Sequence, residues 1–143
     1  MTLIDSSAWI EYYSKTGLEE IMDLVSDAIR KNEAAINGIV HVEILAYASR
    51  DQNYDDLRTD FSSFLWIKLS KTVFDLAVEM GRLLRTIGLT VPTTDLIVAS
   101  SARDAEASLL HYDAHFEKMA DHVSLTTISP LKKGEDSSES SQE

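Results

Sequence analysis

Short apolar runs alternate with helical periodicity along the chain, and this alternation constrains the fold more than any other feature. The apolar runs lie at residues 2–4, 34–36, 108–112 and 123–127. Between them, apolar residues recur at helical spacing, which predicts helices at about 18–29, 39–48, 57–65, 73–87, 96–105 and 116–120. Strands separated by helices require crossover connections. We therefore expect an α/β protein, a three-layer α/β/α sandwich with a central, mostly parallel sheet.

The length of 143 residues is typical of one domain with one core. We place this domain at residues 1–130. A Ser-rich acidic tail, predicted to be disordered, follows at 131–143, because the sequence from Gly134 onward has no apolar residue to bury. The absence of cysteine excludes a disulfide scaffold, a Cys-ligated zinc site and a thiol nucleophile. No apolar run is long enough to span a bilayer and no signal peptide is visible, so we expect a cytoplasmic protein.

Four acids occupy positions at which parallel sheets form ligand sites. Asp5 directly follows the first strand and Asp113 follows a later one, while Glu43 interrupts an apolar helix and Asp95 lies where another helix begins. Ligands bind such sheets outside the carboxyl ends of the strands, so these side chains can meet at one edge. Carboxylates that meet repel one another, and a bound Mg²⁺ or Mn²⁺ removes this conflict. The sequence therefore predicts a metal site.

Each acid also has a purely structural alternative. Asp5 could cap the helix that begins at Ser6 or Ser7, and Asp113 could cap a turn or helix. Asp95 could complement a helix dipole, and Glu43 could form a buried salt bridge. The combination of the four is more specific than any one of them.

These acids lie in motifs that resemble PIN-domain ribonucleases, specifically the VapC-type toxins of toxin–antitoxin pairs. The matching segments are Leu3–Ile10, Val42–Ile44, Thr94–Ala99 and His111–Phe116. Their order and spacing agree with the family over residues 1 to about 128. Each motif is short, but the four in order form a specific match.

The resemblance implies a Rossmann-like sandwich and endonucleolytic cleavage of RNA by a water molecule that Mg²⁺ or Mn²⁺ activates. It also implies a cognate antitoxin partner, and we expect a homodimer. Carried over by position, the metal-binding and catalytic acids are Asp5, Glu43, Asp95 and Asp113, with Ser6 as a supporting residue. One departure is visible, because many members have Thr or Ser at the position of His111. A non-catalytic PIN-like module that binds RNA or protein, and a PIN nuclease of RNA maturation without an antitoxin, are the alternative functions.

The net charge of −11 is unusual for a protein that binds nucleic acid. Positive charge must therefore be local, and His115 and Lys118 are candidates for RNA contact, with ordinary surface solvation as the alternative. A zinc site formed by His111, Asp113 and His115 is disfavoured, because their spacing is not that of a helical pair of ligands.

Three aromatic residues, Trp9, Tyr12 and Tyr13, are candidates for a surface that binds an antitoxin helix. Core packing of Trp9 is the alternative. The amphipathic helix at 73–87 is likewise a candidate for a dimer contact, with its apolar face as core in the alternative interpretation.

Overall fold

The computed structural model describes residues 1–48 and 54–132. Its strands form one sheet in the order β3-β2-β1-β4-β5, and all neighbouring strands pair in parallel. The strands are β1 (Thr2–Ile4), β2 (Ala34–Ile36), β3 (Leu65–Trp66), β4 (Ser108–Leu110) and β5 (Thr127–Ile128). The predicted parallel sheet is thus confirmed.

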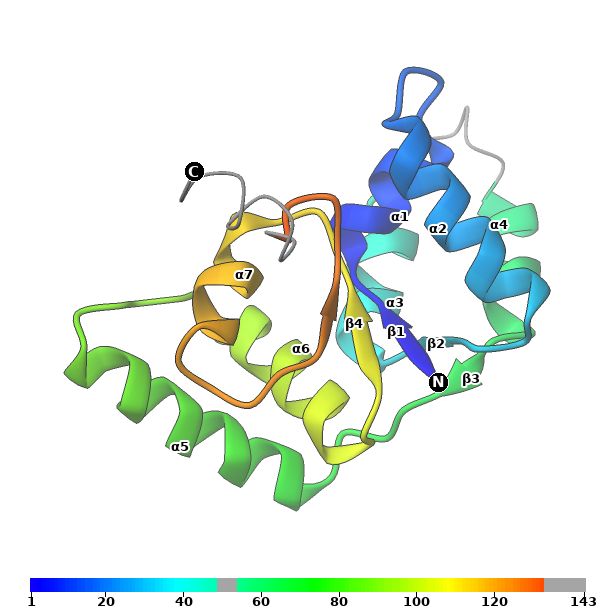
Figure 1. Cartoon of the computed structure of the whole chain (residues 1–143). Helices are drawn as coiled ribbons and strands as arrows, with labels where there is room; N and C mark the ends of the chain where they lie inside the picture. The colour runs from blue at the N-terminus through cyan, green and yellow to red at the C-terminus, as the bar shows by residue number, and fades with distance from the viewer. Residues whose placement is uncertain (49–53, 133–143) are drawn as a thin grey trace, which may run out of the picture.

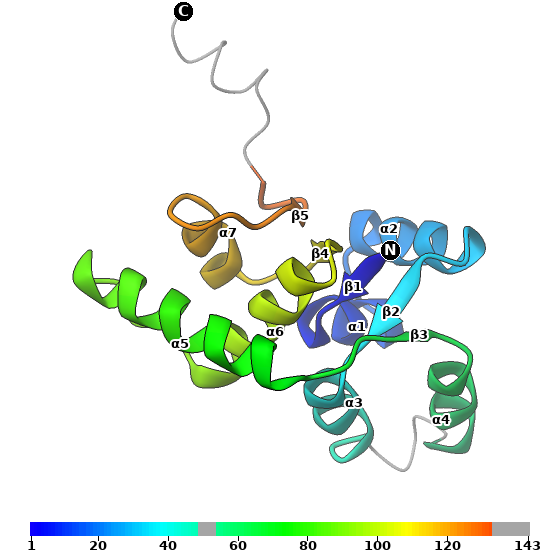
Figure 2. The same cartoon turned by 90° about the horizontal axis from the view of Figure 1, so that it is seen from below.

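Helices cover both faces of the sheet, as predicted. Figure 1 shows α1, α2 and α4 on one side, and α5, α6 and α7 on the other. Seen from below in Figure 2, α6 lies between the sheet and α5. The helices are α1 (Ser6–Tyr13), α2 (Glu19–Arg30), α3 (Gly38–Leu45), α4 (Tyr54–Ser62), α5 (Lys71–Thr86), α6 (Thr93–Asp104) and α7 (Ala114–Ala120).

The sheet reverses its direction of growth between β1 and β4. From β1 the chain adds β2 and β3 on one side, whereas β4 and β5 lie on the other side of β1. Ile4 pairs with Leu110 at the end of these two strands, and the backbone N–H of Asp5 donates to the Leu110 carbonyl at 2.9 Å. Asp5 therefore lies at a topological switch point, where α/β sheets form their ligand sites.

Trp9 lies in the core and has no exposed surface. The centroid of its ring is 5.0 Å from that of Phe61 and 5.2 Å from that of Phe64. The assignment of Trp9 to an exposed partner surface is therefore wrong, and its core alternative is correct, because the first turns of α1 pack against aromatic residues of and after α4. Tyr12 and Tyr13 are partly buried, and their contact with a partner stays a prediction.

Several element boundaries differ from the sequence prediction. The helix expected at 57–65 ends at Ser62, and Leu65 and Trp66 form β3, which is too short to show a strand period. The last strand begins at Thr127 rather than at 123. The helix expected at 96–105 begins earlier, at Thr93, and ends at Asp104, with Pro92 as an N-cap that offers no side-chain hydrogen bond.

The predicted acidic tail falls mostly on residues 133–143, which lie outside the described residues, so the domain boundary stays a prediction. Within α5, Val73, Met80 and Leu84 are buried, whereas Leu83 and the C-cap residue Ile87 are about half exposed. A dimer contact of this helix also stays a prediction. Among the helices of the described residues, none is long and apolar enough to cross a membrane.

Candidate metal centre

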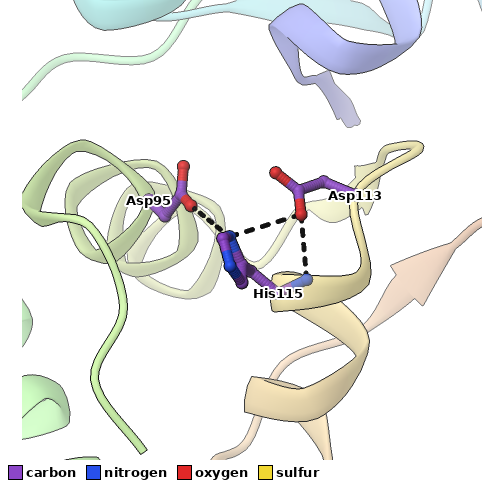
Figure 3. A group of neighbouring side chains, drawn as sticks. All are labelled: Asp95, Asp113 and His115. Atoms are coloured by element: carbon purple, nitrogen blue, oxygen red, sulfur yellow. Dashed lines mark hydrogen bonds and ion pairs between the residues drawn. The ribbon is translucent and has the colours of Figure 1, made fainter.

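Asp95, Asp113 and His115 converge on one point (Figure 3). Asp95 lies in the first turn of α6, Asp113 is the N-cap of α7, and His115 follows two residues later. The Nδ1 atom of His115 is 3.3 Å from Asp95 Oδ2 and 3.4 Å from Asp113 Oδ1. One ligand atom from each of the three residues lies within 4.8 Å of the other two. Two of the four predicted acids are thus brought together, with a histidine between them.

Asp5 is held at the switch point by Ser7. Asp5 Oδ2 accepts hydrogen bonds from the backbone N–H of Ser7 at 3.0 Å and from its hydroxyl at 2.6 Å. The Ser7 hydroxyl oxygen in turn accepts the backbone N–H of Tyr112 at 2.9 Å. Asp5 therefore does cap α1, as in its structural alternative. The same contacts join it to the segment after β4 that carries Asp113.

Hydrogen bonds connect α3, the helix that carries Glu43, to both α1 and α6. The Ser6 hydroxyl donates to Glu43 Oε1 at 2.9 Å, which gives this predicted supporting residue a definite contact. The fully buried Asn37 caps α3 by accepting the N–H of Val40 at 3.0 Å. Its Nδ2 atom donates to the Ser101 hydroxyl of α6 at 2.9 Å. The helices that carry Glu43 and Asp95 are therefore fixed to each other.

The acids of this region influence one another's pKa values. Burial, followed by the negative charges of Asp5 and Asp113, raises the pKa of Asp95 from 3.8 to about 6, and His115 opposes this shift. Burial also raises the pKa of Asp5, against hydrogen bonds from Ser7. The pKa of Glu43 is raised by burial and by the charge of Asp5, against its hydrogen bond from Ser6. A cation would relieve this accumulation of charge.

The donor set fits a divalent metal of the Mg²⁺ or Mn²⁺ type. Carboxylate oxygens are the hard ligands these ions prefer, and an imidazole nitrogen is accepted more readily by Mn²⁺. Among the described residues, the compact group comprises Asp95, Asp113 and His115. Asp5 and Glu43 are coupled to it electrostatically, and their direct contact with an ion stays a prediction.

The remaining candidates lie around this group. His115 faces the two acids, and Lys118 is exposed on α7, so RNA contact by either residue stays a prediction. His111 is fully buried, and its two ring nitrogens face Glu117 and the N–H of Asp113. A zinc site that uses His111 together with Asp113 and His115 does not fit this arrangement.

Sequence reasoning missed Ser7, Asn37, Ser101 and the partner role of Glu117. Each acts through a hydrogen bond that depends on how separate segments pack, and a single polar residue carries no periodic signal. In the sequence, Asn37 before Gly38 indicates only the end of a strand.

Replacing Asn37 by alanine is expected to destabilise the fold by about 2 kcal/mol, because α3 loses its cap and the bond to Ser101 disappears. Urea unfolding followed by circular dichroism measures this loss. Asn37→Ser is the matched control, since it keeps a capping oxygen and should recover part of the stability. An Asn37→Ala variant as stable as the wild type would show that the Asn37 bonds contribute little.

Comparison with known proteins agrees with the architecture and with the motifs. A family model described as PIN domain matches residues 2–122. Ribonuclease VapC11 of Mycobacterium tuberculosis is 29% identical over 134 residues, which cover 90% of this chain and 98% of that protein. VapBC2 from Rickettsia felis, bound to a DNA fragment from its promoter, aligns with a TM-score of 0.73 at 19% identity over 90% of this chain and 97% of that chain. A toxin–antitoxin complex from Klebsiella pneumoniae aligns with a TM-score of 0.70 at 18% identity over 93% and 100% of the two chains.

Proposed function

The chain belongs to the PIN-domain family, and from this premise we propose that it is a Mg²⁺- or Mn²⁺-dependent endoribonuclease, the toxin of a toxin–antitoxin pair. The observation that carries the proposal is the convergence of Asp95, Asp113 and His115 beside Asp5, at the switch point of the sheet. Similarity to a VapC ribonuclease over nearly the whole chain supports the same activity.

Asp95 and Asp113 would hold the metal, and Asp5 and Glu43 would complete the group of carboxylates around it. A bound Mg²⁺ or Mn²⁺ lowers the pKa of a water molecule and offsets the charge that develops on a phosphate under attack. The serine residues beside the acids fix the positions of the carboxylates. Ser7 holds the Asp5 carboxylate, and Ser6 holds that of Glu43. Because these positions are set before substrate arrives, little reorganisation is needed during the reaction.

The proposed partner is a cognate antitoxin. Solved structures similar to this chain include VapBC2 from Rickettsia felis and a toxin–antitoxin complex from Klebsiella pneumoniae, which supports a partner of this kind. Tyr12 and Tyr13 at the end of α1 are the residues that we propose for contact with the antitoxin. We also propose a homodimer, and a cytoplasmic site of action, where RNA and the antitoxin would both be available.

Incubation of the full chain with total RNA tests the proposed activity. We expect cleavage with Mg²⁺ or Mn²⁺, no cleavage after treatment with EDTA, and recovery when the metal is restored. The products should carry 5′-phosphate and 3′-hydroxyl ends. Activity that survives in EDTA would contradict metal dependence. Binding of RNA without cleavage under any metal would favour the non-catalytic alternative.

A further inference from the structure

His111 is a fully buried ionisable residue near the site, and the proposed chemistry does not use it. Its side chain has no exposed surface, and its ring centroid lies 5.2 Å from that of Phe116 in α7. Its backbone N–H donates to the Ile128 carbonyl of β5 at 3.1 Å. The backbone of His111 is therefore held by β5, and its imidazole ring packs against Phe116 in the protein interior.

The two ring nitrogens of His111 have distinct and assignable roles. The backbone N–H of Asp113 lies 3.1 Å from Nδ1, and since an amide N–H can only donate, Nδ1 must be the unprotonated acceptor. The proton of the neutral ring is then on Nε2, which lies 2.6 Å from Glu117 Oε2 and donates to it. Glu117 thus selects the tautomer that can accept from Asp113.

We propose that His111, oriented by Glu117, is a positioning residue for Asp113. This inference rests on the proposed function, because it concerns how one of the metal-binding acids is held. The bond from the Asp113 N–H fixes the backbone at the start of α7. Asp113 Oδ1 accepts the N–H of His115 at 2.9 Å, and the carboxylate is thereby turned towards Asp95. Hydrogen-bond partners behind metal ligands commonly act in this way.

A serine or threonine hydroxyl at position 111 could also accept the Asp113 N–H, so the imidazole supplies the same kind of acceptor from a larger side chain. A larger acceptor needs its own support, and Glu117 in the first turn of α7 provides it. Simple filling of the core does not account for the arrangement, because an apolar side chain of similar size would leave the Asp113 N–H and Glu117 without these bonds.

Binding of Mn²⁺ to the full-length protein, followed by electron paramagnetic resonance, tests the proposal without relying on activity. His111→Leu fills the core but cannot accept a hydrogen bond, and we expect it to bind Mn²⁺ at least about tenfold more weakly than the wild type. His111→Thr restores an acceptor and should recover most of the affinity. Glu117→Gln keeps an acceptor for Nε2 and should stay close to the wild type, whereas Glu117→Leu should weaken binding. Asp121→Asn, exposed at the end of α7, is the unchanged control.

Cleavage kinetics add a second readout. A positioning role predicts that His111→Leu lowers kcat at low Mn²⁺, that excess Mn²⁺ restores much of it, and that KM for RNA changes little. Unchanged Mn²⁺ affinity in folded His111→Leu would overturn the inference, and if that variant does not fold, unchanged affinity in Glu117→Leu would do the same. A wild type that binds no Mn²⁺ would instead remove the proposed function, and the inference with it.

Discussion

Replacing Asp5 by asparagine is expected to slow metal-dependent RNA cleavage at least about a hundredfold while leaving the fold intact. Asparagine is as good an N-cap as aspartate, so its side-chain oxygen can still accept the N–H and hydroxyl of Ser7. The substitution therefore removes a negative charge and little else. Because burial raises the pKa of Asp5, loss of the ionised form should cost no stability.

The experiment compares wild type and Asp5→Asn on the same RNA at saturating Mn²⁺, with thermal unfolding measured in parallel. Asp23→Asn removes an equal charge from the exposed surface of α2 and serves as the matched control. We expect this control to cleave like the wild type. If Asp5→Asn kept its activity within about threefold, Asp5 would be a helix cap and nothing more. A loss of activity accompanied by unfolding would point to the cap instead of the charge.

The position of Asp5 shows what sequence can and cannot predict about this site. The position of Asp5 after β1 and that of Asp113 after β4 follow from the alternation of strands and helices, since both strands end at one edge of a parallel sheet. From the sequence, capping and membership of the site are competing interpretations of Asp5, yet Asp5 caps α1 and lies at the switch point. Because α1 begins directly after β1, one carboxylate can cap the helix and also lie at the switch point.

The contacts that hold the acids in place were not predictable. Ser7 joins Asp5 to Tyr112 across more than a hundred residues, and Asn37 reaches Ser101 in α6. Such pairs depend on how helices and strands pack against one another, and the spacing of residues within one segment does not predict them. The burial of Trp9 has the same origin, because its aromatic neighbours come from α4 and the segment after it.

The acidic character of the whole chain would give a bound metal a thermodynamic role. With a net charge of −11, the protein has little general attraction for RNA, and the clustered carboxylates would repel a phosphate directly. A divalent ion between Asp95 and Asp113 would neutralise these two carboxylates where the proposed substrate must bind. The same ion should then stabilise the folded state, since the unfolded chain does not present this cluster.

Mn²⁺ is therefore expected to raise the melting temperature, and to raise it more at pH 7.5 than at pH 5. Without metal, the pKa of Asp95 is raised from 3.8 to about 6, so between these values the folded protein binds more protons than the unfolded chain. The free energy of unfolding should consequently fall as pH rises through this window. Metal binds the deprotonated carboxylate and must displace a proton at pH 5. At a concentration about 100 times its Kd, the ion adds about 2.7 kcal/mol, which corresponds to roughly 5–10 °C for a domain of this size.

Differential scanning fluorimetry on the metal-free protein, at constant ionic strength, measures these shifts with and without Mn²⁺. Asp95→Asn should lose most of the Mn²⁺ effect and flatten the dependence on pH between about 4 and 6, because its side chain cannot ionise. Asp104→Asn, exposed at the other end of α6, should retain both effects. Equal stabilisation by Mn²⁺ at both pH values would show that metal binding is not coupled to the ionisation of Asp95. Full stabilisation of Asp95→Asn would place the ion elsewhere, because one of the two carboxylates proposed to hold it would then contribute nothing to its binding.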